Sequence, residues 1–171
     1  MAPPQDGERA ISRMLVIAAM LMLSAGSAAA ADAGMAAQCA RVRNDDAISG
    51  YNPALHDALV RAFGRLFPSA PTPPDEREIT AGAHIRCMDG HLLACFTGAN
   101  LPCGKMKTAR DNPGADAFCR ANPNAEVVPA FATGHDTVNL YRCVSGQPVI
   151  TGNALTVDSR GFAASLWTPL D

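Results

Sequence analysis

The sequence lacks the short motifs that mark most familiar catalytic and cofactor sites. It contains no Cys-x-x-Cys pair, the usual signature of redox-active thiols and zinc knuckles. It also contains no Gly-x-Ser-x-Gly nucleophile elbow and no glycine-rich phosphate loop. Paired carboxylates such as Asp45 and Asp46 are sequence neighbours, with nothing to place them across a cleft. We therefore expect no catalytic residue, no metal and no cofactor, and favour a non-enzymatic protein.

Strong charge of one sign is missing as well. The chain has 14 Lys and Arg against 16 Asp and Glu, a formal net charge of −2, and both signs are interspersed. No basic patch argues for a nucleic acid partner. Beyond residue 31, no apolar run approaches the roughly 20 residues that a membrane-spanning helix needs. The partner that we expect is therefore a protein or another envelope ligand.

The beginning of the chain has the pattern of a secretory signal peptide. Arg9 and Arg13 precede an apolar run at 14–23, and small residues follow it. Cleavage could follow residue 30, 31 or 33, and the sequence does not decide among them. With cleavage after residue 31, export to the periplasm or the medium leaves residues 32–171 as a single exported domain. Gln38 stands where a lipid-attachment site needs a small residue before its cysteine, so we do not expect a lipoprotein.

The cysteines are even in number, and all of them follow the predicted signal peptide. In an oxidising compartment this favours structural disulfides, whose pairing the sequence alone does not determine. One candidate pair brackets a loop and a short helix, Cys103 with Cys119. The disulfide candidates are Cys39, Cys87, Cys95, Cys103, Cys119 and Cys143.

Two segments carry the same Arg-Cys-x-x-Gly motif and are typical of tight hairpins, His84–Phe96 and Leu140–Ile150. In the first, the expected two-residue turn is Asp89-Gly90. This turn places Cys87, two residues before Asp89, opposite Leu92, two residues after Gly90. Because side chains alternate along a strand, Cys87 and Cys95 point to opposite faces and should not bond to each other. The two motifs are either a degenerate internal repeat or ordinary hairpin chemistry, and both interpretations stay open.

Two helices are predicted. Asn52 and Pro53 begin an amphipathic helix over about 53–67, with apolar residues at three- and four-residue steps. A second Asn-Pro pair begins a short helix over about 113–121. Residues 32–50 are expected to form a loosely ordered lead-in, and the proline-rich residues 68–78 a surface connection.

The remaining pattern is one of short strands and turns. Strands are expected at 127–131, 137–144, 147–151, 154–157 and 162–167. The predicted fold class is α+β: a small antiparallel β-meander with one amphipathic helix and one short helix, stapled by disulfides.

Four residues are weak ligand-site candidates. His135 and Asp136 adjoin in a glycine turn, and imidazole with carboxylate is a combination found in metal and hydrolytic sites. Lys105 and Lys107 lie near a glycine in a turn-rich loop and could bind an anion, although such cations are more often solvated. A zinc site that combined His84 with His91 is not expected, because the two lie far apart along the arms of a tight hairpin.

The motif from Tyr141 through Arg142 and Cys143 to Gly146 resembles the opening motif of the periplasmic C-type lysozyme inhibitors, and the segment 85–90 echoes it. That resemblance implies a small disulfide-containing β-barrel that inhibits lysozyme. The family's later serine-glycine-alanine-tyrosine segment has no counterpart here, so no inhibitory residue is assigned. Our leading hypothesis is a small exported, disulfide-stabilised binding or envelope-associated protein. The alternatives are such an inhibitor, or a small hydrolase or metal enzyme using His135 and Asp136.

Overall fold

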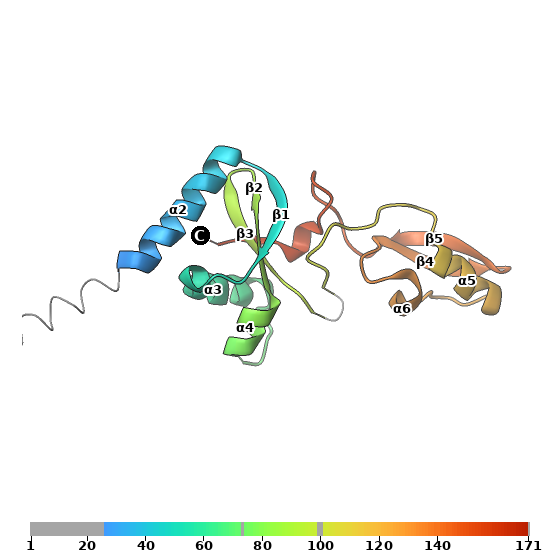
Figure 1. Cartoon of the computed structure of the whole chain (residues 1–171). Helices are drawn as coiled ribbons and strands as arrows, with labels where there is room; N and C mark the ends of the chain where they lie inside the picture. The colour runs from blue at the N-terminus through green and yellow to red at the C-terminus, as the bar shows by residue number, and fades with distance from the viewer. Residues whose placement is uncertain (1–25, 73, 99–100, 171) are drawn as a thin grey trace, which may run out of the picture.

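A computed structural model describes residues 26–72, 74–98 and 101–170 of the protein. Figure 1 shows two parts side by side, and the chain passes from the first to the second after strand β3 and returns after strand β5. The elements of the first part are α2 (Gly26–Val42), β1 (Asp45–Gly50), the 3-10 turn η1 (Pro53–Leu55), α3 (His56–Leu66), α4 (Glu76–Gly82), β2 (Ala83–Met88) and β3 (His91–Phe96). The second part contains α5 (Pro113–Ala121), α6 (Ala130–Thr133), β4 (Asn139–Val144) and β5 (Gln147–Asn153). The returning chain adds η2 (Ala164–Leu166) and β6 (Thr168–Pro169) to the first part.

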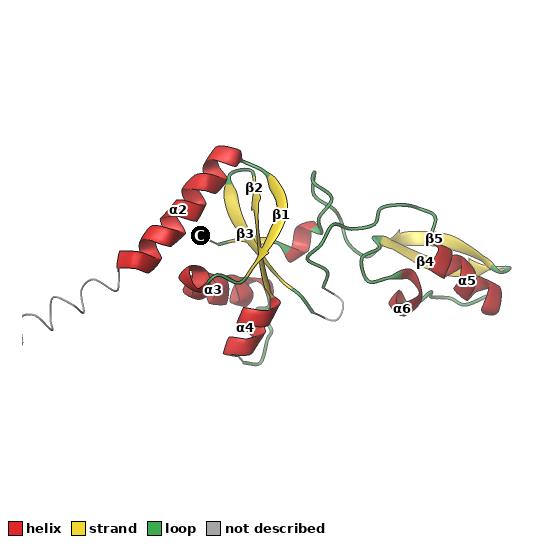
Figure 2. Ribbon diagram, viewed as in Figure 1, coloured by secondary structure: helices red, strands yellow, loops and turns green. Residues whose placement is uncertain are grey.

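The strands fall into two antiparallel sheets instead of one continuous meander. The first has the order β1-β2-β3-β6, and the second consists of β4 and β5. Figure 2 shows helices beside both sheets. Together with three disulfides, this arrangement confirms the α+β, disulfide-stapled class.

The first sheet is covered on both faces. On one face the apolar stripe of α3 packs in the main core, where Leu55, Leu59 and Ala62 are almost fully buried beside Ile85 and Ala94. The opposite face is covered by residues 158–167, which we call the returning segment. Both cores are built from the alternating side chains of the same two strands, β2 and β3.

The strand pairing expected for residues 84–96 is the pairing observed. Cys87 lies opposite Leu92, and Met88 lies opposite His91. Asp89 and Gly90 have φ of 52° and 89°, the left-handed values that this two-residue turn requires.

The two predicted helices are confirmed. The Asn52 side chain accepts a hydrogen bond from Ala54 N (3.0 Å) before η1 and α3, and Asn112 caps α5 by accepting from Ala115 N (3.0 Å). Each cap satisfies a backbone N–H that has no partner inside its helix, and the proline that follows loses no hydrogen bond there.

Five expectations for other segments were wrong. The supposed lead-in is helix α2 followed by strand β1, because alanine-rich sequence favours helix and Cys39 ties it to the sheet. The proline-rich connection ends early, because Asp75 and Glu78 form a capping box that begins α4. Residues 127–131 form no strand, because residues 130–133 form helix α6. Residues 154–157 and 162–167 form bends, isolated bridges and η2 instead of strands. The expected cleavage point at residue 31 falls within α2, and residues 1–25 lie outside the described part.

All six cysteines are paired, as Cys39–Cys87, Cys95–Cys103 and Cys119–Cys143. Cys87 and Cys95 are not bonded to each other, as expected. The predicted pairing of Cys103 with Cys119 was wrong. Cys119 faces inward from α5 and is bonded to Cys143 on β4, whereas Cys103 follows β3 closely and is bonded to Cys95.

The molecule contains the same helix–hairpin unit twice. We call residues 26–50 and 83–96 the first module, and residues 113–128 and 139–153 the second module. In each, a helix is bonded by a disulfide to the first strand of a hairpin, as Cys39–Cys87 and as Cys119–Cys143. The chain after the helix then lies along that strand: β1 pairs with β2, and Ala125 O accepts from Cys143 N on β4 (2.8 Å).

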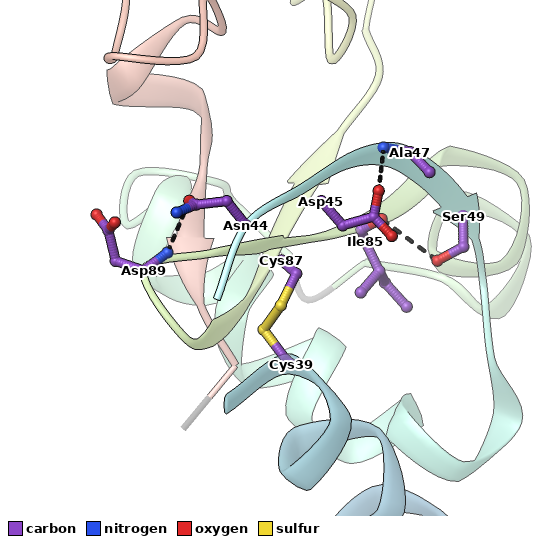
Figure 3. Close-up of a disulfide and its surroundings, with 8 residues drawn as sticks. All are labelled: Cys39, Asn44, Asp45, Ala47, Ser49, Ile85, Cys87 and Asp89. Atoms are coloured by element: carbon purple, nitrogen blue, oxygen red, sulfur yellow. Dashed lines mark hydrogen bonds between the residues drawn. A yellow bond between two sulfur atoms is a disulfide. The ribbon is translucent and has the colours of Figure 1, made fainter. Parts of the chain in front are cut away.

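The hairpin turns are held in the same way in both modules. Asp89 N donates to Asn44 Oδ1 (3.0 Å), as Figure 3 shows, and Ser145 N donates to Asn124 Oδ1 (3.4 Å). The two turns also make equivalent backbone hydrogen bonds. Gly90 N donates to the carbonyl of residue 43 (2.8 Å), and Gly146 N donates to the carbonyl of residue 123 (2.9 Å). The shared motif therefore marks a true structural repeat.

Candidate binding surface

Each hairpin has an outer face, the face that points away from its disulfide-bonded helix. In the first module the outer face is His84, Arg86, Met88, His91, Leu93 and Cys95. In the second it is Leu140, Arg142, Val144, Gln147, Val149 and Thr151. Counted from the turn glycine, the two sets occupy matching positions, so that Arg86 corresponds to Arg142.

The first outer face is covered by the returning segment. Leu93 and Cys95 are buried there against Phe162 and Trp167, and Met88 packs beside them. The disulfide Cys95–Cys103 fixes the neighbouring chain over the same face. Burial of this face is therefore part of the fold.

Arg86 is the polar centre of that buried contact. It is 2% exposed, and its guanidinium carbon lies 4.0 Å from the centroid of the Phe162 ring and 4.7 Å from that of Trp167. Such stacking is a favourable cation–π geometry. Arg86 Nη2 also donates to Asp158 Oδ2, so the buried charge is neutralised. Within the described residues, Nε and Nη1 of Arg86 and Nε1 of Trp167 are buried without a hydrogen-bond partner.

Backbone hydrogen bonds in its own turn hold the Asp158 carboxylate in position beside Arg86. Its Oδ1 accepts from Arg160 N (2.8 Å) and Phe162 N (3.0 Å). Burial raises the pKa of the Asp158 carboxyl, but these backbone hydrogen bonds and the Arg86 guanidinium outweigh burial and hold that pKa below its usual range. The carboxylate is therefore ionised when it pairs with Arg86 at neutral pH.

Among the residues that the structure describes, none covers the second outer face in this way. Leu140, Val144 and Val149 are 46%, 42% and 39% exposed, and Arg142 is exposed among them. Arg142 lies directly opposite Val149 across the strands, as Arg86 lies opposite Leu93. This surface combines an exposed guanidinium with aliphatic side chains, which suits contact with another macromolecule.

Lys105 and Lys107 each lie beside a carboxylate. Lys105 Nζ lies 2.6 Å from Asp46 Oδ2, and Arg160 Nε donates to Asp46 Oδ1 (2.8 Å). The hydrogen bond from Arg160, and to a smaller extent the one from Lys105, lowers the pKa of the Asp46 carboxyl to about 2. Lys107 Nζ lies 3.0 Å from Asp136 Oδ2, so each lysine is matched by a carboxylate.

His135 and Asp136 lie in the turn before β4. His135 is exposed at a hollow of about 310 Å³ that Leu140 and Leu155 also line. The Asp136 carboxylate is held by Lys107, and within the described ranges no three His, Cys, Asp or Glu side chains are grouped as metal ligands. The turn therefore offers a polar rim beside the second outer face.

The first part of the molecule carries an apolar hollow of about 550 Å³ at the end of α3. The rings of Phe63, Phe67 and Phe96 pack together beside it, with centroids 4.7–6.4 Å apart. The described residues that line it, from 63–70, 96–98 and Leu101, have uncharged side chains. It could take an apolar group, but none of the described lining residues carries a charge to orient one.

Sequence reasoning did not identify Arg142 as a functional residue. The signal was present, because both Arg-Cys-x-x-Gly motifs contain the arginine. What the sequence did not show is that one arginine is covered and the other is not. Comparisons with family models, with curated proteins and with solved structures found no match to this chain.

Proposed function

We propose that this protein is a small exported binding protein, without enzymatic activity, whose second module provides the contact surface. One observation carries the proposal. Among the described residues, eight large apolar side chains are exposed, and five of these belong to the second part of the molecule. The five are Val127, Phe131, Leu140, Val144 and Val149. Three of these, Leu140, Val144 and Val149, share the second outer face. Exposed apolar side chains that are grouped on one face mark interaction sites.

Export is supported by the covalent structure. Three disulfides form and persist in oxidising compartments and are rare in reducing ones. No helix in the described ranges is long and apolar enough to cross a membrane. These observations fit an extracellular or periplasmic protein, and the predicted signal peptide would supply the route.

The two alternatives gain less support. A lysozyme inhibitor is itself a binding protein, but the motif that resembles that family lies here on a two-stranded sheet. For a hydrolase or metal enzyme, Asp136 would have to leave Lys107, which lies 3.0 Å away. We therefore place the function in binding and not in the His135-Asp136 turn.

Site-specific photo-crosslinking in the native host would test the proposal. A photoreactive residue would replace Val144 in the full chain, and the matched control would replace Arg61, which is exposed on α3 in the first part. We expect one defined envelope product from position 144 and none from position 61. Equal products from both positions, or none from either, would overturn the binding proposal. Recovery of the protein from the cytoplasm with free thiols would overturn the proposed export.

A further inference from the structure

The duplicated module shows what chemistry the second outer face can receive. The two hairpins share their turn, their disulfide to a helix, and an arginine four residues before the turn glycine. They differ in cover: Arg86 is 2% exposed beneath the returning segment, whereas Arg142 is exposed. The cover on the first outer face therefore indicates which chemical groups the equivalent second outer face can bind.

The occupant of the first outer face has a simple chemical pattern. Asp158 supplies the carboxylate to the guanidinium, and four residues later Phe162 supplies the ring that stacks on it. Trp167 adds a second ring at 4.7 Å. The rings also cover Leu93, the aliphatic side chain opposite the arginine.

We propose that the second outer face binds a peptide segment of another protein, in which an acidic residue is followed four residues later by an aromatic one. This inference rests on the proposed function and names its partner by chemistry. The carboxylate pairs with Arg142, the aromatic ring stacks on the same guanidinium, and the rest of the ring covers Val149 and Val144. Carboxylate and ring are the two groups that a guanidinium on an aliphatic surface binds best.

The chain's own returning segment is not the occupant. It is already engaged with Arg86, and Cys95–Cys103 holds the neighbouring chain in place on that face. The position that corresponds to Cys95, five residues after the turn glycine, is Thr151 in the second module. The second face therefore has no covalent clamp, and its cover can associate and dissociate.

The probe that tests this inference is a synthetic peptide with the sequence of residues 156–169, TVDSRGFAASLWTP. It would be titrated into the full, ¹⁵N-labelled chain, and the backbone amide shifts would be followed by NMR. We expect shifts at β4 and β5, centred on Arg142 and Val149. Replacing the aspartate of the peptide by asparagine, or its phenylalanine by alanine, should each weaken binding about tenfold, which corresponds to about 1.4 kcal/mol.

The matched pair of protein variants is Arg142→Gln and Arg120→Gln, which both remove an exposed arginine of the second module. Arg142→Gln should weaken peptide binding about tenfold, and Arg120→Gln should leave it unchanged. Equal binding to both variants, shifts confined to β2 and β3, or no shifts at all would overturn the inference. If the peptide fails while crosslinking at position 144 persists, the binding function stands and the chemistry assigned to the partner is wrong.

Discussion

Arg86 and Arg142 occupy the same position in two equivalent hairpins, four residues before the turn glycine, yet one is 2% exposed and the other lies open to solvent. The difference comes from the returning segment, which covers one hairpin and not the other. The same local structure therefore serves as a core element in one module and as a surface in the other.

The buried pair of Arg86 and Asp158 should be a sensitive point for stability. Asp158→Asn keeps an oxygen that can accept from Arg160 N and Phe162 N, but it leaves the guanidinium buried without a counter-charge. Breaking a buried pair by removing one partner costs about 3 kcal/mol or more. We expect that loss in urea unfolding of the variant.

A second change separates charge from packing at this site. Arg86→Met in the Asp158→Asn background removes the buried guanidinium charge that has lost its carboxylate partner. It keeps an unbranched side chain beneath Phe162 and Trp167. An apolar replacement of a buried pair is often close to neutral. The double variant should therefore recover most of the lost stability. A double variant that is as unstable as Asp158→Asn alone would show that packing, and not charge, sets the cost.

Asp46 should make folding stability depend on pH in the acid range. Its pKa is about 2 in the folded protein, because Arg160 and Lys105 bind the carboxylate, and about 3.9 in an unfolded chain. A depressed folded pKa stabilises the fold above pH 4, and this contribution is lost as the pH falls through about 2. Unfolding free energies of the protein and of Asp46→Asn should therefore differ above pH 4 and converge near pH 2. A difference that stays constant from pH 6 to pH 2 would contradict this assignment.

The turn glycines test the equivalence of the two modules. Gly90 and Gly146 have φ of 89° and 83°, where an L side chain is strained. Gly90→Ala and Gly146→Ala should each cost about 1 kcal/mol of unfolding free energy. The control is Gly152→Ala on β5, where an added Cβ meets no atom within 4 Å and φ is not in the left-handed range. A control as costly as the turn variants would show that strand position, and not turn geometry, dominates.

The local parts of this structure were predictable from the sequence. The register of β2 and β3 follows from Asp89-Gly90 and the two-residue alternation, and α5 follows from Asn112-Pro113. Each of these signals lies within the element that it specifies. Helix α2 was missed because its alanine-rich sequence overlaps the small-residue region of the predicted signal peptide, and its disulfide partner lies 48 residues away.

The repeat and the candidate surface depend on contacts between distant residues. Asn44 and Asp89 are 45 residues apart, whereas their counterparts Asn124 and Ser145 are 21 apart, because α3 and α4 are inserted in the first module. A search at one fixed period therefore does not find the repeat. The cover on Arg86 is similarly hidden, since Asp158 lies 72 residues away.

The disulfide Cys119–Cys143 should stabilise the second module separately from the first. It closes 24 residues and joins α5 to β4, and both of its cysteines are buried in a core distinct from that of the first sheet. Closing a loop of this length contributes about 3 kcal/mol. Replacing both cysteines by alanine should therefore lower amide-exchange protection in β4 and β5 while protection in β2 and β3 is retained. The matched variant replaces Cys95 and Cys103 by alanine, and it should loosen the cover on Arg86 and leave β4 and β5 protected. Loss of protection throughout the molecule in either variant would mean that the two modules unfold as one unit.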